Sequence, residues 1–246
     1  MAKYDFMSFG EPNIRMSPPE HDRLGQGDEL KLGIAAAELN CCVNISNLSV
    51  EKLLPTMKTA YVTKLVDNWT GRYIVTRAQM YGVDMSNVVV EPYDKIGRTR
   101  NGLAFIEVGI KADNTDENFS SIDPMNYKKV AEKVMAKYPH IKVVGTSLRE
   151  VKTALLNNWQ GCMMTRDGFF VSRKYENIEI NDRVGGGDSF ASALIYSMLQ
   201  GYDGQRTIDF ATAFSALCHT IRNDWNLVSR QEAESLAAGG SARVKR

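Results

Sequence analysis

The stretch that decides the fold is DRVGGGDSF, from Asp182 to Phe190. A strand-like run, 175–180, precedes it, and a helix-like run, 188–200, follows it. Three glycines between a strand and a helix let the backbone approach a ligand closely, and the N–H groups at the helix N-terminus favour an anion. An aspartate beside that anion, Asp188, suggests a proton-abstracting or metal-organising task. From spacing alone, a flexible loop with Asp188 or Ser189 as a helix N-cap is an equally good interpretation.

Outward from this turn, strand-like and helix-like patterns alternate along the chain, which predicts an α/β layered domain with a mostly parallel sheet. We expect one domain over 1–246 with a small strand-rich excursion, and no internal repeat or low-complexity linker. Strands are expected at 4–8, 59–65, 88–90, 103–108 and 141–144, a hairpin at 159–172, loop or hairpin at 11–33, and helices at 34–48, 71–81, 126–138, 207–221 and 231–238.

The composition is that of an ordinary globular protein. The 246 residues are 43% hydrophobic and 24% charged, with 30 basic and 29 acidic side chains, which argues against disorder, nucleic-acid binding and a membrane surface. No apolar run approaches the roughly 20 residues that cross a bilayer. The four cysteines and three histidines have no metal-ligand spacing, so no metal ligands are expected in the chain. With no apolar signal core at the start, a reducing cytoplasm is the expected location.

The motif resembles the signature of PfkB/ribokinase-type carbohydrate kinases, in which a glycine anion hole precedes a catalytic aspartate. The resemblance is specific for 2-keto-3-deoxygluconate kinases, and its segments run in family order from Tyr4 to Leu236. The segments that carry it include FGEPNIRMSPPEHDRL (9–24), YVTKLVDNWTGRYI (61–74), GRTRNGLAFIEVG (97–109) and TAFSALCHTIRNDWNLVS (212–229).

This resemblance implies a ribokinase-like three-layer α/β/α fold with a small β-rich lid, and phosphoryl transfer from ATP to 2-keto-3-deoxygluconate to give its 6-phosphate. It implies that Asp188 is the catalytic base, and that Gly185, Gly186 and Gly187 hold the charge of the transferring phosphate. Gly185 and Gly187 would also contact the nucleotide, and Mg²⁺ would enter with ATP. Ala216 and Asn226 would border the adenine, although core packing is the stronger interpretation of both.

The substrate loop departs from the family pattern. A Gly-Gly pair of the family is replaced by Ala35 and Ala36, which should weaken the site if the backbone must approach a sugar or adopt positive φ. Asn40 is retained and is a candidate for hydrogen bonding to the sugar, or an ordinary turn or cap asparagine. Arg98 is a further substrate candidate, although it and Arg100 could equally be exposed solubilising charges.

A larger departure follows Gly109, where the chain passes through KADNTDENFSSID directly into the helix expected at 126. In the family this interval carries several strands and helices, and its D-x-N-x-R strand does not occur here. Roughly three βα units, about 100 residues, are missing, so the domain is shortened after about 110 and its central strands are absent. The lid-like strands are expected within 11–32 and 88–108. For Lys111–Ser121 a solvated linker is a better interpretation than an oxygen cage for calcium.

Two functions remain open on these observations. The intact glycine turn favours an ATP-dependent sugar-acid kinase, whereas the alanine pair and the missing middle favour a catalytically inactive PfkB-like protein with a binding or assembly role. Sheet edges exposed by the shortening, together with the family's association through its lid, make a homo-oligomer plausible. The sequence does not decide which sugar acid is used, or whether the shortening is natural or engineered.

Overall fold

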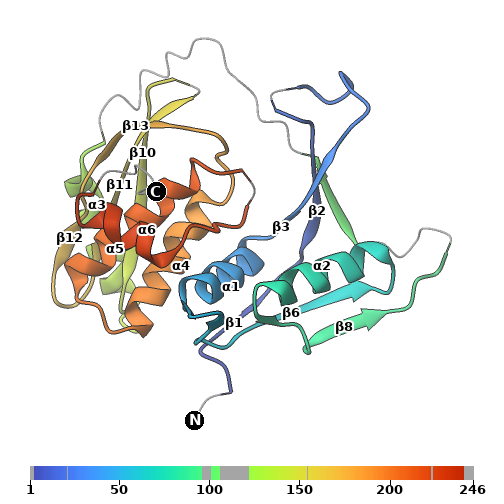
Figure 1. Cartoon of the computed structure of the whole chain (residues 1–246). Coiled ribbons are helices and arrows are strands. Elements are labelled where there is room, and N and C mark those ends of the chain that lie inside the picture. Colours follow the sequence, from blue (N-terminus) through green and yellow to red (C-terminus); the bar gives the residue numbers. More distant parts are fainter. Residues whose placement is uncertain are drawn as a thin grey trace. The chain divides into compact units, whose positions relative to one another are not determined.

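The computed structural model describes residues 3–20, 22–95, 101–105, 122–153, 155–222 and 224–240. The chain divides into two compact units, which are described separately (Figure 1). Unit 1 comprises Met1–Ile110 and the later segment Asn223–Leu227, and unit 2 comprises Lys111–Arg222 and Val228–Arg246. The assignment of 1–246 to a single domain stays a prediction.

Unit 1 is built on a parallel sheet. Strand β1 (Phe6–Phe9) pairs with β6 (Thr59–Val66), and the short β7 (Val83–Asp84) and β8 (Val88–Glu91) both pair with β6. All of these pairs are parallel, as expected from the alternation of strands and helices. Apolar side chains of the sheet and its helices form the buried core, among them Leu39, Val43, Tyr61, Leu65 and Ile74.

Of two helices in unit 1, one has flanking residues whose chemistry explains where it begins and ends. Helix α1 (Ala37–Leu48) follows an extended N-cap without a side-chain cap, whereas α2 (Trp69–Met80) starts at Asn68, whose side chain accepts a hydrogen bond from the Gly71 N–H. Just beyond α2, Gly82 has φ of +80°, a left-handed conformation that suits glycine after a helix end. The predicted helices over 34–48 and 71–81 are confirmed, except that the first begins at Ala37 and the second at Trp69.

The segment expected to be loop or hairpin is a hairpin. Strands β2 (Asn13–Ser17) and β3 (Lys31–Ala35) pair antiparallel, and β9 (Gly102–Phe105) joins β2 in parallel to complete a three-stranded sheet. A ribbon of two residues per strand, β4 (Val50–Glu51) and β5 (Leu54–Pro55), follows α1.

Unit 2 contains an antiparallel sheet. Strand β11 (Leu156–Met164) lies beside β10 (Val144–Val151), and β12 (Phe169–Val171) and β13 (Tyr175–Glu179) also pair with β11. The expectation of a mostly parallel sheet is therefore wrong for this unit. The reason is connectivity: short turns join these strands, and short turns can join only antiparallel neighbours. The strand expected at 141–144 begins instead at Val144 and runs to Val151. The polar residues within it hide the alternation of apolar side chains by which a strand is predicted.

Helices cover the sheet of unit 2 on both faces (Figure 1). Helices α4 (Gly186–Leu199) and α5 (Gly204–Cys218) pack closely against β10 and β11. A Cβ added at Gly145 of β10 or at Gly161 of β11 would lie 2.5 Å from a side-chain atom of these helices. Helix α3 (Pro124–Lys137) contacts β10 and β11, and α6 (Arg230–Ala237) contacts α5. The helices expected at 126–138, 188–200, 207–221 and 231–238 are confirmed.

The described part of the chain has no helix with the length and apolar character required to span a membrane. None of the four cysteines forms a disulfide bond, and three of them are buried.

Candidate functional site

The glycine turn is a strand-to-helix connection in unit 2, as its sequence predicts. The turn lies between β13 and α4, and Gly185 occupies the N-cap position with φ of +81° and ψ of −8°. Ser189 N–H donates to the Gly185 carbonyl at 2.8 Å, which makes this the first bond of the helix. No side chain caps α4, so its first N–H groups depend on other partners and favour an anion.

The three glycines occupy different environments. Gly185 is left-handed, a conformation that L-residues with a side chain adopt at a cost. Gly186 is buried, and a Cβ there would lie 2.7 Å from Nε2 of His219. Gly187 is exposed, and a Cβ there would meet no neighbouring group of the described chain within 4 Å. The turn therefore packs against His219 on one side, at Gly186, and is open on the other side, at Gly187; these are called its back and its front.

The C-terminal end of α5 supports the turn from behind. Ser215 Oγ donates to the Gly186 carbonyl at 2.7 Å. The His219 carbonyl accepts from the N–H of Asn181 at 2.8 Å and from that of Asp182 at 3.4 Å. The carboxylate of Asp182, which is buried, accepts from the Val184 N–H at 3.1 Å. The backbone of the turn is thus fixed before any ligand arrives, which is the condition for electrostatic stabilisation of a transferring group.

Positive charge gathers beside the turn. Arg149 lies opposite Trp159 in the pairing of β10 with β11, so both side chains lie on the same face of the sheet. Burial, and then the charge of Arg149, lower the pKa of Arg183 within the turn. Burial lowers the pKa of His219 to about 4, and the charges of Arg149 and Arg183 contribute. Two guanidinium groups this close together suit a multiply charged anion.

Asp188 lies in the first turn of α4, directly after the exposed Gly187, and its side chain is half-buried. Its backbone carbonyl accepts from Ser192 Oγ, which fixes the main chain at this point. A carboxylate here is next to the helix N-terminus, where negative charge is favoured. Because it is partly accessible, this carboxylate can take a proton from a hydroxyl that approaches past Gly187.

The predicted substrate residues belong to unit 1. Ala36 is the N-cap of α1 with φ of −166°, and neither Ala35 nor Ala36 is among the residues with positive φ. The alanines therefore cause no backbone strain. If they weaken the sugar site, it is because their methyl groups keep the sugar from approaching the backbone. Asn40 is 2% exposed, and its N–H donates to the Ala36 carbonyl at 2.8 Å. Its role as a sugar ligand stays a prediction.

The remaining candidates divide into packed and undescribed residues. Ala216 is buried within α5, and its carbonyl accepts from the His219 N–H at 3.3 Å. Asn226 is fully buried in unit 1, where its N–H donates to Asn44 Oδ1 at 2.9 Å. Both environments agree with the packing interpretation. Arg98 and the segment Lys111–Ser121 lie outside the described residues.

Sequence reasoning missed the residues that support the turn. Arg149, Ser215 and His219 are far from the motif along the chain, and only the packing of α5 and β10 brings them to it. Arg183 lies within the motif and could have been noticed as a cation beside a predicted anion site.

No group of three or more histidine, cysteine, aspartate or glutamate side chains in the described ranges is arranged to hold a metal ion.

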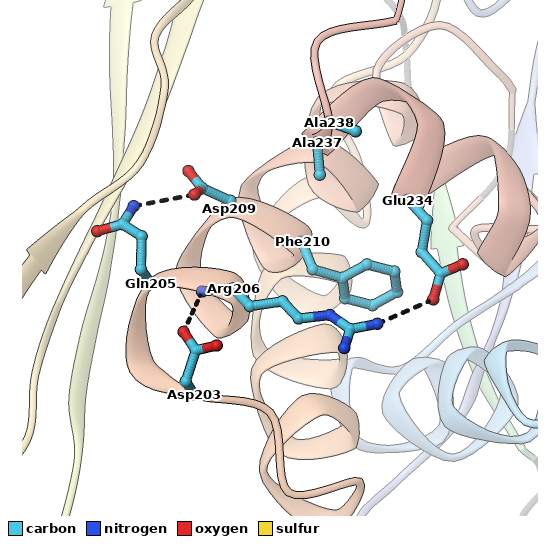
Figure 2. Close-up of a pocket in the computed structure, with 8 residues that line it drawn as sticks. All are labelled: Asp203, Gln205, Arg206, Asp209, Phe210, Glu234, Ala237 and Ala238. Carbon is cyan, nitrogen blue, oxygen red and sulfur yellow. Dashed lines mark hydrogen bonds and ion pairs between the residues drawn. The ribbon is translucent and has the colours of Figure 1, made fainter.

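A hollow of about 580 Å³ lies between α5 and α6 in unit 2, but its polar groups already have partners (Figure 2). The Arg206 guanidinium forms an ion pair with Glu234 at 3.7 Å, and the backbone N–H of Arg206 donates to the Asp203 side chain. Gln205 donates to Asp209 at 2.9 Å. The hollow is lined by residues from the first turns of α5, whereas the glycine turn contacts the other end of this helix. It is therefore separate from the glycine turn.

No protein-family model matches the chain. A curated relative is the 2-dehydro-3-deoxygalactonokinase of Haloferax volcanii, 20% identical over 322 aligned positions that span 98% of this chain and 99% of the relative. Among solved structures, the 2-dehydro-3-deoxygluconokinase of Thermotoga maritima matches with a TM-score of 0.81 and 24% identity, over 95% of this chain and 99% of that one. The chain has the ribokinase-like fold of carbohydrate kinases.

A sugar kinase of Pyrococcus horikoshii, solved in complex with ATP, has the same fold, with a TM-score of 0.61 and 15% identity over 92% of this chain and 96% of that one. The resemblance to carbohydrate kinases is thus confirmed, and at these identities the structural likeness establishes the fold. The 322 aligned positions against 246 residues agree with a missing internal segment. The shortfall is smaller than the three βα units that we expected.

Proposed function

We propose that the chain is an ATP-dependent sugar-acid kinase, with 2-keto-3-deoxygluconate, converted to its 6-phosphate, as the first candidate substrate. The observation that carries the proposal is the glycine turn: a left-handed Gly185, a supported Gly186 and an open Gly187 lead directly to Asp188 at the start of α4. Backbone N–H groups and a carboxylate at this spacing suit phosphoryl transfer, which depends mainly on positioning and charge stabilisation.

The residues of the turn have distinct roles in this reaction. Asp188 takes the proton of the attacking hydroxyl, and the N–H groups of Gly186 and Gly187 stabilise the charge on the transferring phosphoryl group. Arg149 and Arg183 hold the polyphosphate of ATP by charge. When bound, Mg²⁺ neutralises charge on the nucleotide phosphates. We propose that it enters with the nucleotide.

The substrate class rests on the relatives. The Haloferax protein is named for a 2-dehydro-3-deoxygalactonate substrate and the Thermotoga protein for the gluconate epimer. Both substrates are 2-keto-3-deoxy sugar acids that carry a carboxylate and several hydroxyls. Asn40 is the candidate hydrogen-bonding residue in this chain, Arg98 a candidate partner for the carboxylate, and the backbone at Ala35 and Ala36 the surface that the sugar approaches.

The second candidate is an inactive relative retained for binding or assembly. Two observations favour it: alanines replace the glycine pair in the substrate loop, and the chain is shorter than the alignment with its curated relative. We propose a cytoplasmic location, where ATP is available and the four thiols stay reduced. A homo-oligomer is also proposed, and sedimentation at several protein concentrations tests it.

The experiment is an ADP-release assay with ATP, Mg²⁺ and a panel of 2-keto-3-deoxygluconate, 2-keto-3-deoxygalactonate, gluconate and ribose. We expect release of ADP with the two keto-deoxy acids and little with ribose. A folded, soluble protein that releases no ADP with any of them contradicts the kinase proposal and favours the inactive relative.

A further inference from the structure

We propose that His219 is a positioning residue for phosphoryl transfer, which holds Gly186 and thereby the N–H groups at the start of α4 in the orientation that the reaction needs. This inference rests on the proposed kinase function, and it assigns a role to a residue that no motif marks. Its basis is a set of contacts between one side chain and the back of the glycine turn.

The imidazole of His219 fills the space between the sheet and the turn. The ring packs against Trp159 on β11 in a tilted arrangement, with the ring centroids 4.4 Å apart and the planes at 59°. Its Nε2 and Cε1 atoms lie 2.7 and 2.8 Å from where a Cβ of Gly186 would be. Only 2% of the residue is exposed, so the ring cannot move away without breaking one of these contacts. The ring therefore limits how closely the backbone at Gly186 can approach the sheet.

The hydrogen bond of the ring determines its tautomer. Nδ1 lies 2.8 Å from the Ser215 carbonyl, which can only accept, so Nδ1 carries the proton. Burial and the nearby Arg149 and Arg183 keep the ring neutral at neutral pH, with its pKa lowered to about 4. Nε2 is then a bare nitrogen facing Gly186. A neutral ring here adds no positive charge to the turn, so binding of a phosphate by charge falls to Arg149 and Arg183.

The same stretch of α5 holds the backbone of the turn at two further points. Ser215, whose carbonyl orients the ring, also donates through Oγ to the Gly186 carbonyl. The His219 carbonyl accepts from the Asn181 and Asp182 N–H groups where the chain enters the turn. Displacement of the ring should therefore shift Gly186 while the entry to the turn stays bound.

The test uses His219→Asn, whose amide can keep the donor to Ser215, and His219→Gln, which reaches toward Gly186. His140→Asn, at an exposed histidine of the same unit, is the matched control. We expect kcat to fall about 10–100-fold in His219→Asn with the KM for the sugar acid unchanged, because the loss is confined to the transition state. His219→Gln should recover part of that loss, and His140→Asn should behave as wild type.

Hydrogen exchange supplies a readout that needs no turnover. In His219→Asn, exchange of the 186–189 amides should speed up, while the rest of α4 keeps its protection. The second such readout is a pair of variants in which a larger residue at 186 is compensated by a smaller one at 219. Gly186→Ala should lower the Tm. Adding His219→Ala should restore part of the Tm, because the imidazole ring no longer contacts the new methyl group.

These two readouts separate failure of this inference from failure of the kinase proposal. If wild type lacks turnover while both readouts behave as expected, positioning by His219 stands and the kinase proposal falls. Uniform loss of protection across unit 2, unchanged exchange at 186–189, or no recovery in the double variant overturns the positioning role.

Discussion

At the scale of single residues, the three consecutive glycines are identical in chemistry and different in purpose. Gly185 is required for its left-handed backbone, Gly186 for its contact with His219, and Gly187 for the open space in front of it. The sequence GGG does not distinguish these roles, because each role depends on the neighbouring groups that surround the glycine in the folded protein.

Alanine at each of the three positions separates the roles. Gly185→Ala should lower the free energy of unfolding by about 1–2 kcal/mol, the cost of a left-handed conformation with a side chain. Gly187→Ala should leave this free energy within about 0.5 kcal/mol of wild type but strongly reduce turnover, because its methyl group projects where the phosphate approaches. Urea unfolding and the ADP-release assay measure the two effects. Equal destabilisation by Gly185→Ala and Gly187→Ala would argue against this division.

His219 makes stability depend on pH in a defined window. Its pKa falls from 6.5 to about 4 on folding, so between these values the unfolded chain binds more protons than the folded one. The stability contribution is therefore fully present above about pH 6.5 and is lost as the pH falls toward 4, by about 3 kcal/mol at most. Urea unfolding at pH 7.5 and pH 5 should show a smaller decrease for His219→Asn than for wild type. An equal decrease in both would contradict a buried, neutral His219.

At the scale of elements, the start of α2 is held by a compact polar network. The Asn101 side chain, which is buried just before β9, accepts from the Val66 N–H at 2.9 Å and donates to Asn68 and Thr70 at 3.0 and 2.7 Å. A single asparagine thereby joins the end of β6, the cap of α2 and the beginning of β9.

This network leaves no room for a side chain at Gly71. A Cβ there would lie 2.2 Å from the Val66 carbonyl oxygen, a backbone atom that cannot rotate away. Gly71→Ala should therefore destabilise the protein by about 1–3 kcal/mol or more. Gly27→Ala, where a Cβ has nothing within 4 Å, is the control and should change little. Thermal unfolding measures both, and similar Tm values for the two variants would contradict the crowding at Gly71.

Elements were predictable where local chemistry marks them. Gly82 marked the end of α2, although the helix starts at Trp69 rather than at the predicted Gly71, and the apolar spacing of α3, α4 and α5 marked helices. In unit 2 the hairpin predicted at 159–172 is confirmed by the antiparallel pairing of β11 with β12. The antiparallel pairing of β10 and β13 with β11 was not predicted, because the α/β pattern elsewhere in the chain suggested parallel pairing. In the site, the turn and Asp188 were visible as a motif, whereas Arg149 and His219 join it only through packing between distant segments.

At the scale of the whole molecule, the chain returns to unit 1 near its C-terminal end. The segment Asn223–Leu227 belongs to unit 1, where Asp224 forms a buried ion pair with Arg15 of β2. The Trp225 ring packs against Tyr81 with centroids 5.2 Å apart, and the backbone of Asn226 is bound by Asn44 and Asn47 of α1. Unit 1 is therefore completed by residues distant in sequence.

Breaking the ion pair should be costly because it leaves a buried charge without its partner. Asp224→Ala should lower the free energy of unfolding by about 3–5 kcal/mol. The exposed pair of Arg72 and Asp67, with N and O atoms 3.0 Å apart, is the control. Asp67→Ala should cost at most about 1 kcal/mol. Urea unfolding compares the two, and equal costs would contradict a structural role for the return segment.

The shortened middle is also a property of the whole molecule. Among the described strands, β1 pairs only with β6 in unit 1, and β10 pairs only with β11 in unit 2. Each therefore has an edge to which a further strand could add. That the missing central strands belong at these edges stays a prediction. The alignment of 322 positions with a relative, against 246 residues here, agrees with a missing internal segment.

The most direct test of the account is transfer of the γ-phosphate of ATP to 2-keto-3-deoxygluconate, followed with labelled ATP in the presence of Mg²⁺. Wild type, Asp188→Asn and Asp167→Asn are compared, the last being the same substitution at an exposed turn of unit 2. The account predicts a labelled sugar-acid phosphate from wild type and Asp167→Asn, and its loss by at least about 100-fold in Asp188→Asn. Equal transfer by Asp188→Asn, or none by a folded wild type, would contradict it.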